Sequence, residues 1–565
     1  MPISLPSWFG ASALSRLAVG GFMGLSLFLN CFGVCDVRTI SSFIHYRILL
    51  MGSKEGRMLQ PHMTITTYSH HFKVSQMSHR GRDFCRYFAK GFLTYGLSKA
   101  GGRFVSTVDK VYAAADDARS YFRFAISALP EFLEELKQQH FQDEFIVRKT
   151  GPAFNPVKVN ITIKPHFTPR DFQHQYIDYL SAEKPACKLV GLQTGKGKTF
   201  CALAAAANIG LRTVVLVKGG FLGKWMGDIQ EITNTPKKRI LQVNGTKGLA
   251  ALFKNAKKKS FKYDFILISI NTIKPWFDLY EKQLGVYKGF GFTNHPEDWI
   301  NDIGAGCVIT DEVHLMFHAN YKINMYTHVP YSIALSATLL TKDKTMERLY
   351  EYMFPRVDRA PEMVIDRYIH SYALHFNFDP FTRVKTQQMG QSMYSHAALE
   401  ESLMKNKNTL NRYLAMIDFS LGFTYFKNPK KDKKAAVFCA TKEMCGAVTD
   451  YLKAKYRNLD IRRYISEDPY ENAIEPDIRV TTIGSCGTGI DIPGLVSVIL
   501  TQAIESIQAN VQVLGRLRKI EGEKVEFVFF TADNLDKHVK YYADKKIMLK
   551  QRALTFSEQY YKGFI

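Results

Sequence analysis

The feature that most constrains this chain is a glycine-rich loop between an apolar run and an alanine-rich run. The loop reads Gln193, Thr194, Gly195, Lys196, Gly197, Lys198 and Thr199. This order predicts a strand, a phosphate-binding loop and a helix, because glycines let backbone N–H groups converge on phosphate oxygens at a helix N-terminus. Lys198 would reach the β- and γ-phosphates, and Thr199 would ligate Mg²⁺. Leu192 replaces the first glycine of the usual pattern, and a plain glycine-rich turn is the alternative.

A second polar cluster follows the apolar run Cys307 to Ile309 and contains Asp311, Glu312 and His314. Asp311 can hold Mg²⁺ through water, and Glu312 can polarise the water that attacks the terminal phosphate. Two carboxylates after a strand also occur as a helix N-cap pair. Downstream of a phosphate loop, however, they predict a nucleoside triphosphatase.

From these motifs the chain resembles the DExH-type helicases and translocases of superfamily 2, over roughly residues 165 to 530. Asp311 to His314 match the signature of that family. Arg170 and Gln173 resemble the segment whose glutamine reads adenine, and Ser336 and Thr338 resemble the coupling motif III. The resemblance implies ATP and Mg²⁺ as the cofactors.

The same resemblance predicts the nucleic-acid contacts of the first half. Residues 214 to 225 resemble motif Ia, with Lys218 and Lys224 in place of the usual proline and glutamine. Ser269 and Thr272 belong to a segment that resembles motif Ic. The resemblance implies that these side chains approach the sugar–phosphate backbone.

The second half of the chain carries segments that resemble motif IV (435–441), motif V (487–494) and motif VI (512–518). Motif V implies that Thr488 contacts nucleic acid and that Gly489 and Asp491 contact the nucleotide. Motif VI implies that Gln512 couples the two domains and that Arg516 and Arg518 neutralise the transition-state charge. Lys519 stands where the family has its second arginine, so the arginine finger remains open between Arg518 and Lys519.

The predicted fold is α/β, with two tandem RecA-like domains of parallel sheets and flanking helices after a small α+β accessory domain. The expected boundaries are an apolar extension (1–57), the accessory domain (58–155), the first RecA-like domain (160–365), the second (366–533) with a polar, helix-rich insertion near 380–434, and a tail (534–565). The tail pattern predicts one long basic helix.

The accessory domain is expected to contain strands at 103–112, 121–128, 144–149 and 157–163, and a helix at 129–137. Its layout resembles that of phage helicases of the UvsW type. The apolar extension before it is a mis-assigned start, a membrane anchor or a packed helix, and only the anchor would bring the chain to a membrane.

The net charge of the chain is +23, which favours a polyanionic partner. The nine cysteines lack metal-ligand or disulfide spacing, so they predict buried thiols in a reducing, cytoplasmic compartment. The His70-His71 pair is expected at the surface.

Three functional hypotheses follow. The favoured one is an ATP-dependent DNA helicase or branch-remodelling translocase, of phage type. The runner-up within the enzyme class is an RNA helicase. The third is a non-catalytic nucleic-acid-binding or annealing protein with a relict ATP site. The intact set Lys198, Asp311, Glu312 and Arg516 argues against this third hypothesis.

Overall fold

The computed structural model describes residues 62–100, 103–116, 118–193, 195–282, 292, 294–336, 343–361, 365–387, 393–427, 432–465, 467–486 and 490–565. The apolar extension therefore lies outside the described residues. Contacts divide the chain into two compact units: Met1–Ala153 with Pro275–Gly291, and Phe154–Lys274 with Phe292–Ile565. No helix among the described residues is long and apolar enough to cross a membrane.

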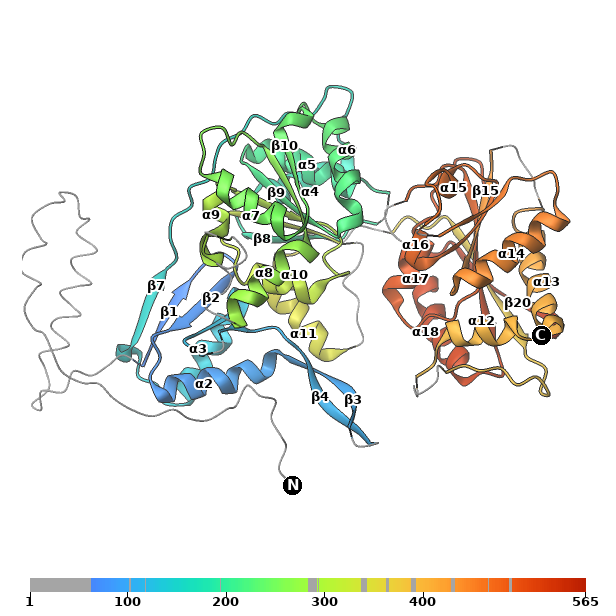
Figure 1. Cartoon of the computed structure of the whole chain (residues 1–565), viewed down its shortest axis with the longest axis horizontal. Coiled ribbons are helices and arrows are strands. Elements are labelled where there is room, and N and C mark those ends of the chain that lie inside the picture. The colour runs from blue at the N-terminus through green and yellow to red at the C-terminus, as the bar shows by residue number, and fades with distance from the viewer. Residues whose placement is uncertain are drawn as a thin grey trace, which may run out of the picture. The chain divides into compact units, whose positions relative to one another are not determined.

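The first unit is built on a five-stranded mixed sheet with the order β5-β6-β2-β1-β7. Its elements are β1 (Met63–Thr67), β2 (His71–Ser75), α2 (His79–Ala89), β5 (Ala114–Ala115), β6 (Tyr121–Ala125), α3 (Leu129–Gln138) and β7 (Ile146–Thr150). The strands β3 (Leu93–Ala100) and β4 (Arg103–Val111) form a separate antiparallel hairpin that extends away from α2 and α3 (Figure 1).

The core of this unit is aromatic. Phe132 of α3 is fully buried, and its ring lies 5.0 Å from Phe72 of β2, 5.0 Å from Phe88 and 5.1 Å from Phe84 of α2. Phe124 of β6 closes the cluster at 5.8 Å. The proline at the start of α3 fits a first turn, where its missing N–H costs no hydrogen bond. One helix residue thus joins both layers of the unit.

The strands and helix expected at 103–112, 121–128, 129–137 and 144–149 are present, although β6 stops at Ala125 and a 3₁₀ turn follows. Two expectations are wrong. Residues 157–163 form no strand and make only isolated bridges, Lys158 with Leu211 and Ile163 with Thr233.

The His70-His71 pair is also not at the surface, since both residues are 1 % exposed. His71 belongs to β2, which has a strand on either side, and its Nε2 lies 2.6 Å from Nη1 of Arg123. The surface prediction failed because the sequence around the two histidines does not indicate which strands will pair with β2 and cover them.

The second unit contains two parallel sheets. The first has the order β10-β11-β9-β12-β13-β8. Its strands are β8 (Cys187–Val190), β9 (Thr213–Val217), β10 (Ile240–Val243), β11 (Phe265–Ser269), β12 (Cys307–Thr310) and β13 (Tyr331–Leu335). Its helices are α4 (Asp171–Ser181), α5 (Lys198–Ile209), α6 (Leu222–Ile232), α7 (Gly245–Ala256), α8 (Ile270–Lys282), α9 (Trp299–Ile303), α10 (Phe317–Asn324) and α11 (Lys344–Met353). Central strands such as β9 and β11 are buried along their whole length and mostly apolar, because helices cover both faces of a parallel sheet.

The second parallel sheet has seven strands in the order β16-β17-β15-β18-β19-β14-β20. These are β14 (Ile369–Asn377), β15 (Lys434–Cys439), β16 (Ile461–Tyr464), β17 (Ile478–Thr482), β18 (Leu495–Leu500), β19 (Val525–Ala532) and β20 (Thr555–Phe564). The helices are α12 (His396–Met404), α13 (Lys407–Phe423), α14 (Lys442–Lys455), α15 (Glu471–Ile474), α16 (Ile483–Cys486), α17 (Ile507–Leu514) and α18 (Asp536–Arg552).

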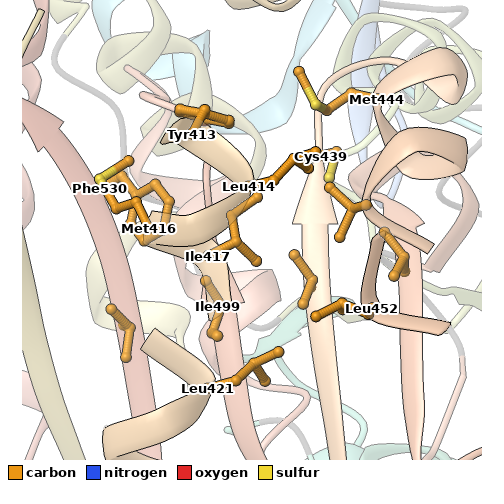
Figure 2. Close-up of a cluster of buried hydrophobic side chains, with 14 of the residues drawn as sticks. Tyr413, Leu414, Met416, Ile417, Leu421, Cys439, Met444, Leu452, Ile499 and Phe530 are labelled. Atoms are coloured by element: carbon orange, nitrogen blue, oxygen red, sulfur yellow. The ribbon is translucent and has the colours of Figure 1, made fainter. Parts of the chain in front are cut away.

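One face of this sheet is covered by α13 and α14. Figure 2 shows the buried side chains of this layer, with Leu414, Ile417 and Leu421 of α13 facing Cys439 of β15 and Leu452 of α14. The opposite face packs on α17 and α18. Helices therefore cover both sides of the sheet, and both α/β parts of the second unit have the RecA-like architecture expected from the sequence.

The tail differs from its prediction. Helix α18 ends at Arg552, and β20 then pairs in parallel with β14 as an edge strand. Residues 555–564 are rich in threonine, phenylalanine and tyrosine, which favour strands over helices. The basic residues of α18 dominated the tail pattern and concealed the change of element.

Candidate functional site

Three motif-bearing strands place their ends at one edge of the first parallel sheet. In this sheet β13 lies between β8 and β12, and both pairings are parallel. The glycine-rich loop follows β8, Asp311 and Glu312 follow β12, and Ser336 follows β13. Parallel strands have their carboxyl ends on the same side, so residues far apart in sequence meet there.

The loop itself requires two glycines. Gly195 and Gly197 have φ angles of +84° and +81°, a left-handed conformation that glycine adopts without strain. A Cβ on Gly197 would also collide with the amide of Gln173. That amide nitrogen donates to the carbonyl of Lys196 at 3.0 Å, while its oxygen accepts from the N–H of Arg170 at 2.9 Å. Gln173 thus ties α4 to the loop.

Helix α5 begins at Lys198 with no side-chain cap and no acidic residue in its first turn. The first N–H groups of a helix have no partner within it, and they carry the positive end of the helix dipole. The side-chain oxygen of Gln193, the first residue of the loop, is buried and accepts no hydrogen bond from the described residues. This end of α5 is therefore suited to an anion.

Lys198 and Glu312 form an ion pair with 3.0 Å between Nζ and Oε1. Burial alone would raise the pKa of the Glu312 carboxyl, but the charge and hydrogen bond of Lys198 and the charge of Arg516 hold that pKa below its usual value. Glu312 has a φ of +45°, an uncommon conformation for a residue with a side chain. The strained turn after β12 is what aims this carboxylate at the loop.

Asp311 is held by two hydrogen bonds. Its Oδ1 accepts from the N–H of Glu312 at 2.9 Å, and its Oδ2 accepts from the indole N–H of Trp225 at 2.9 Å. Burial and the neighbouring Glu312 raise the pKa of the Asp311 carboxyl. Sequence reasoning missed Trp225, which lies in the segment resembling motif Ia and looks there like an ordinary core residue.

His314 joins motifs from both sheets. Its Nδ1 lies 2.8 Å from Oγ of Ser336 and 3.4 Å from Oε2 of Glu312, and its Nε2 lies 2.9 Å from the side-chain amide of Gln512. Burial lowers the pKa of His314. A neutral ring with its proton on Nδ1 satisfies both the Ser336 and the Gln512 contacts.

The two arginines of the predicted motif VI lie at the same site. Arg516 is 5 % exposed and donates to the carbonyl of Ile490. Arg518 pairs with Asp491 at 3.2 Å, and a Cβ on Gly195 would lie 2.8 Å from Nε of Arg518. Arg518 therefore lies against the glycine-rich loop, whereas Lys519 is exposed.

These residues fit a nucleotide with a divalent cation. The uncapped α5, the loop glycines and Lys198 offer positive charge and N–H donors to phosphates. Asp311 and the hydroxyl of Thr199, the second residue of α5, supply the oxygen ligands that Mg²⁺ prefers, and Mg²⁺ usually keeps several waters. No group of three or more His, Cys, Asp or Glu suited to a metal occurs in the described part of the chain. The cysteines described are all free, and Cys187 alone among them is not fully buried.

The predicted nucleic-acid residues lie at the neighbouring strands β9 and β11. Lys218 and Lys224 are exposed, whereas Ser269 is only 6 % exposed. A Cβ on Gly219 would lie 3.4 Å from Oγ of Ser269, so the ends of the two strands meet. The hydroxyl of Thr272 accepts from the N–H of Gly245 at 3.3 Å. The predicted residues Thr194, Thr338, Thr488 and Gly489 lie outside the described residues.

Comparison with known proteins agrees with this geometry. Residues 166–341 match the family described as "Type III restriction enzyme, res subunit". The matched residues contain the glycine-rich loop, the Asp311-Glu312 pair and all six strands of the first parallel sheet. No curated protein matches the chain.

Two solved structures are among those that match the chain. The structure of S. cerevisiae Dbp5 bound to RNA and ADP BeF3 has 13 % identity and a TM-score of 0.43, covering 70 % of this chain and 90 % of that one. The crystal structure of T4 UvsW has 14 % identity and a TM-score of 0.31, covering 88 % of this chain and 99 % of that one.

Proposed function

We propose that the chain is an ATP-dependent DNA helicase or branch-remodelling translocase. The observation that carries this proposal is the pairing of Lys198 with Glu312 at 3.0 Å, at the uncapped start of α5. A phosphate-binding lysine and a candidate base meet there although more than a hundred residues separate them in sequence. A relict site would have no need to keep both groups in a strained, partly buried arrangement.

The proposed roles follow from charge and position. Lys198 and the first N–H groups of α5 bind the phosphates, and Thr199 and Asp311 hold Mg²⁺, which neutralises the charge that develops on them. Glu312, with its lowered pKa, is ionised at neutral pH and accepts a proton from the attacking water. Arg516 and Arg518 stabilise the negative charge of the transition state.

His314 supplies the proposed link between hydrolysis and movement. His314 contacts Ser336 after β13 and Gln512 of α17. A shift of the Glu312 side chain on hydrolysis would therefore move residues of both RecA-like domains. Strand movement would follow from opening and closing of the two RecA-like domains during the nucleotide cycle. Exposed Lys218 and Lys224 would hold the phosphates of the strand.

DNA is the proposed partner because the matched family is named for a restriction enzyme, a class that acts on DNA. The high net charge suits either nucleic acid. The proposed domain division is the one given by the sequence, with the accessory domain before two motor domains.

The test is ATP turnover by the purified chain with single-stranded DNA, duplex DNA, forked DNA and RNA compared side by side. Stimulation that is strongest with DNA, together with displacement of a labelled strand from the fork, is the expected result. Stronger stimulation and unwinding with RNA would identify an RNA helicase instead. Absence of turnover with every nucleic acid, with binding retained, would identify the relict site.

A further inference from the structure

Trp225 makes a contact that the proposed motif roles do not explain. It lies in the first turns of α6, is 0 % exposed, and belongs to the core of the first parallel sheet. Its indole N–H nevertheless donates to Oδ2 of Asp311 at 2.9 Å. Packing alone would explain the burial of Trp225, but its indole N–H also donates to the carboxylate proposed to hold the cation.

A second buried tryptophan of the same domain provides the comparison. Trp299 is also 0 % exposed, but its indole N–H donates to the backbone carbonyl of Tyr326 at 3.0 Å. A buried indole needs some acceptor, and a carbonyl meets that need without any functional consequence. For Trp225 the acceptor is a charged side chain, so the bond also acts on that side chain.

The effect on Asp311 follows from the geometry of a carboxylate. One oxygen is fixed by the N–H of Glu312 and the other by Trp225, so the carboxylate plane cannot rotate without breaking one of the two bonds. An ionised carboxylate has about four lone-pair positions, and two remain available. The carboxylate is therefore held in one orientation before any ligand arrives, which lowers the cost of binding.

We infer that Trp225 is a positioning residue, whose indole N–H holds Asp311 in the orientation that binds the divalent cation of the nucleotide. This inference rests on the proposed ATPase function. Outer groups that orient a metal ligand contribute measurably to metal affinity, and their loss costs about 10–100-fold. Trp225 therefore sets how much Mg²⁺ the site requires, while the phosphate contacts of Lys198 are independent of it.

The first test is the substitution Trp225→Phe, which keeps an aromatic ring but removes the donor. Binding of a fluorescent ADP analogue is titrated with Mg²⁺ and also measured in EDTA. We expect the half-saturating Mg²⁺ concentration to rise about 10–100-fold, with affinity in EDTA unchanged. Trp299→Phe is the matched control, since it also removes a buried indole, and it should leave the Mg²⁺ requirement at the wild-type value.

The second test measures the Mg²⁺ response on the protein with all its tryptophans, so it does not depend on whether Trp225→Phe folds; substituted proteins serve only for assignment. All four tryptophans are labelled as 5-fluorotryptophan and observed by ¹⁹F NMR. The resonance of Trp225 is assigned by removing the other three in turn. Addition of Mg²⁺ to the ADP-bound protein should shift the Trp225 resonance and leave that of Trp299 in place.

The outcomes separate the two proposals. A wild-type protein that shows no Mg²⁺-dependent nucleotide binding contradicts the proposed function itself. If the wild type does bind, but Trp225→Phe has the Mg²⁺ requirement of Trp299→Phe and the Trp225 resonance does not respond to Mg²⁺, the positioning role is overturned. The proposed function would then stand without it.

Discussion

Glu312 has a backbone conformation that is unfavourable for its residue type. A left-handed φ costs a side-chain-bearing residue roughly 1–2 kcal/mol, and the value here is +45°. The arrangement is kept because it turns the carboxylate toward Lys198 and His314. Such local strain tends to concentrate at functional sites, where surrounding contacts hold it in place.

Lys198→Ala should remove ATP turnover and leave the fold intact. The ammonium of Lys198 lies at the start of α5, where it pairs with Glu312 at 3.0 Å and would neutralise phosphate charge. Turnover is measured by phosphate release, and folding by circular dichroism. Lys254→Ala, an exposed lysine of α7, is the control and should behave as wild type. Wild-type turnover in Lys198→Ala would refute the site.

Glu312→Gln should separate binding from hydrolysis. The amide preserves the shape of the side chain and can still accept from Lys198, but it cannot take a proton from water. We expect ATP to remain bound while single-turnover hydrolysis falls about 10²–10⁴-fold, the usual loss for a general base. A fall of less than about tenfold would mean that another group is the base.

Sequence patterns placed the glycine loop and the Asp-Glu pair directly after apolar strands, and the structure has strands β8 and β12 there. Trp225 was missed because an aromatic residue on an amphipathic helix is ordinarily a core residue. Its hydrogen bond to Asp311 depends on how α6 packs on the sheet, where it contacts β11, and no local pattern encodes that packing. The left-handed backbone conformation of Glu312 could not be predicted for the same reason.

At the scale of elements, α18 shows how a charged pattern can conceal buried positions. Lys545 is 3 % exposed, and its Nζ lies 4.6 Å from the centre of the Phe529 ring in β19. A lysine stem can cover apolar surface, but here the charged end is buried as well. Burial lowers the pKa of Lys545 from 10.5 to about 7. The following strand β20 was missed because one long basic helix was expected over the whole tail.

Lys545→Met should stabilise the protein in a pH-dependent manner. The pKa of Lys545 is lower in the fold than in the unfolded chain, so the charged lysine opposes folding fully below pH 7. The penalty shrinks as pH rises from 7 to 10.5, at about 1.4 kcal/mol per pH unit. The increase in Tm should therefore be largest near pH 6.5 and small near pH 10.5. Lys550→Met, on the exposed face of α18, should change Tm little at any pH.

The opposite pH profile, or destabilisation at every pH, would contradict this account of Lys545. It would indicate that the contact with the Phe529 ring outweighs the cost of burying the charge.

At the scale of the whole molecule, the excess of positive charge is not explained by ion pairing within the fold. The chain has 75 lysines and arginines against 52 acidic residues. Many described ion pairs are exposed. Each joins one basic and one acidic side chain, so ion pairing does not reduce the excess of basic residues. Such a surplus destabilises a compact state through self-repulsion, and a polyanionic partner offsets it.

Nucleic-acid binding should therefore depend steeply on salt and hardly at all on base sequence. For single strands log K falls with log salt by about 0.7 per phosphate contact, so five contacts cost roughly a hundredfold in affinity between 50 and 200 mM salt. ATPase stimulation should decline in parallel.

The double variant Lys218→Ala, Lys224→Ala should reduce the slope of log K against log salt by about 1.4, while Lys254→Ala should leave that slope unchanged. Binding that ignores salt, or stimulation by one sequence only, would instead indicate a protein that reads bases, because phosphate contacts carry no sequence information.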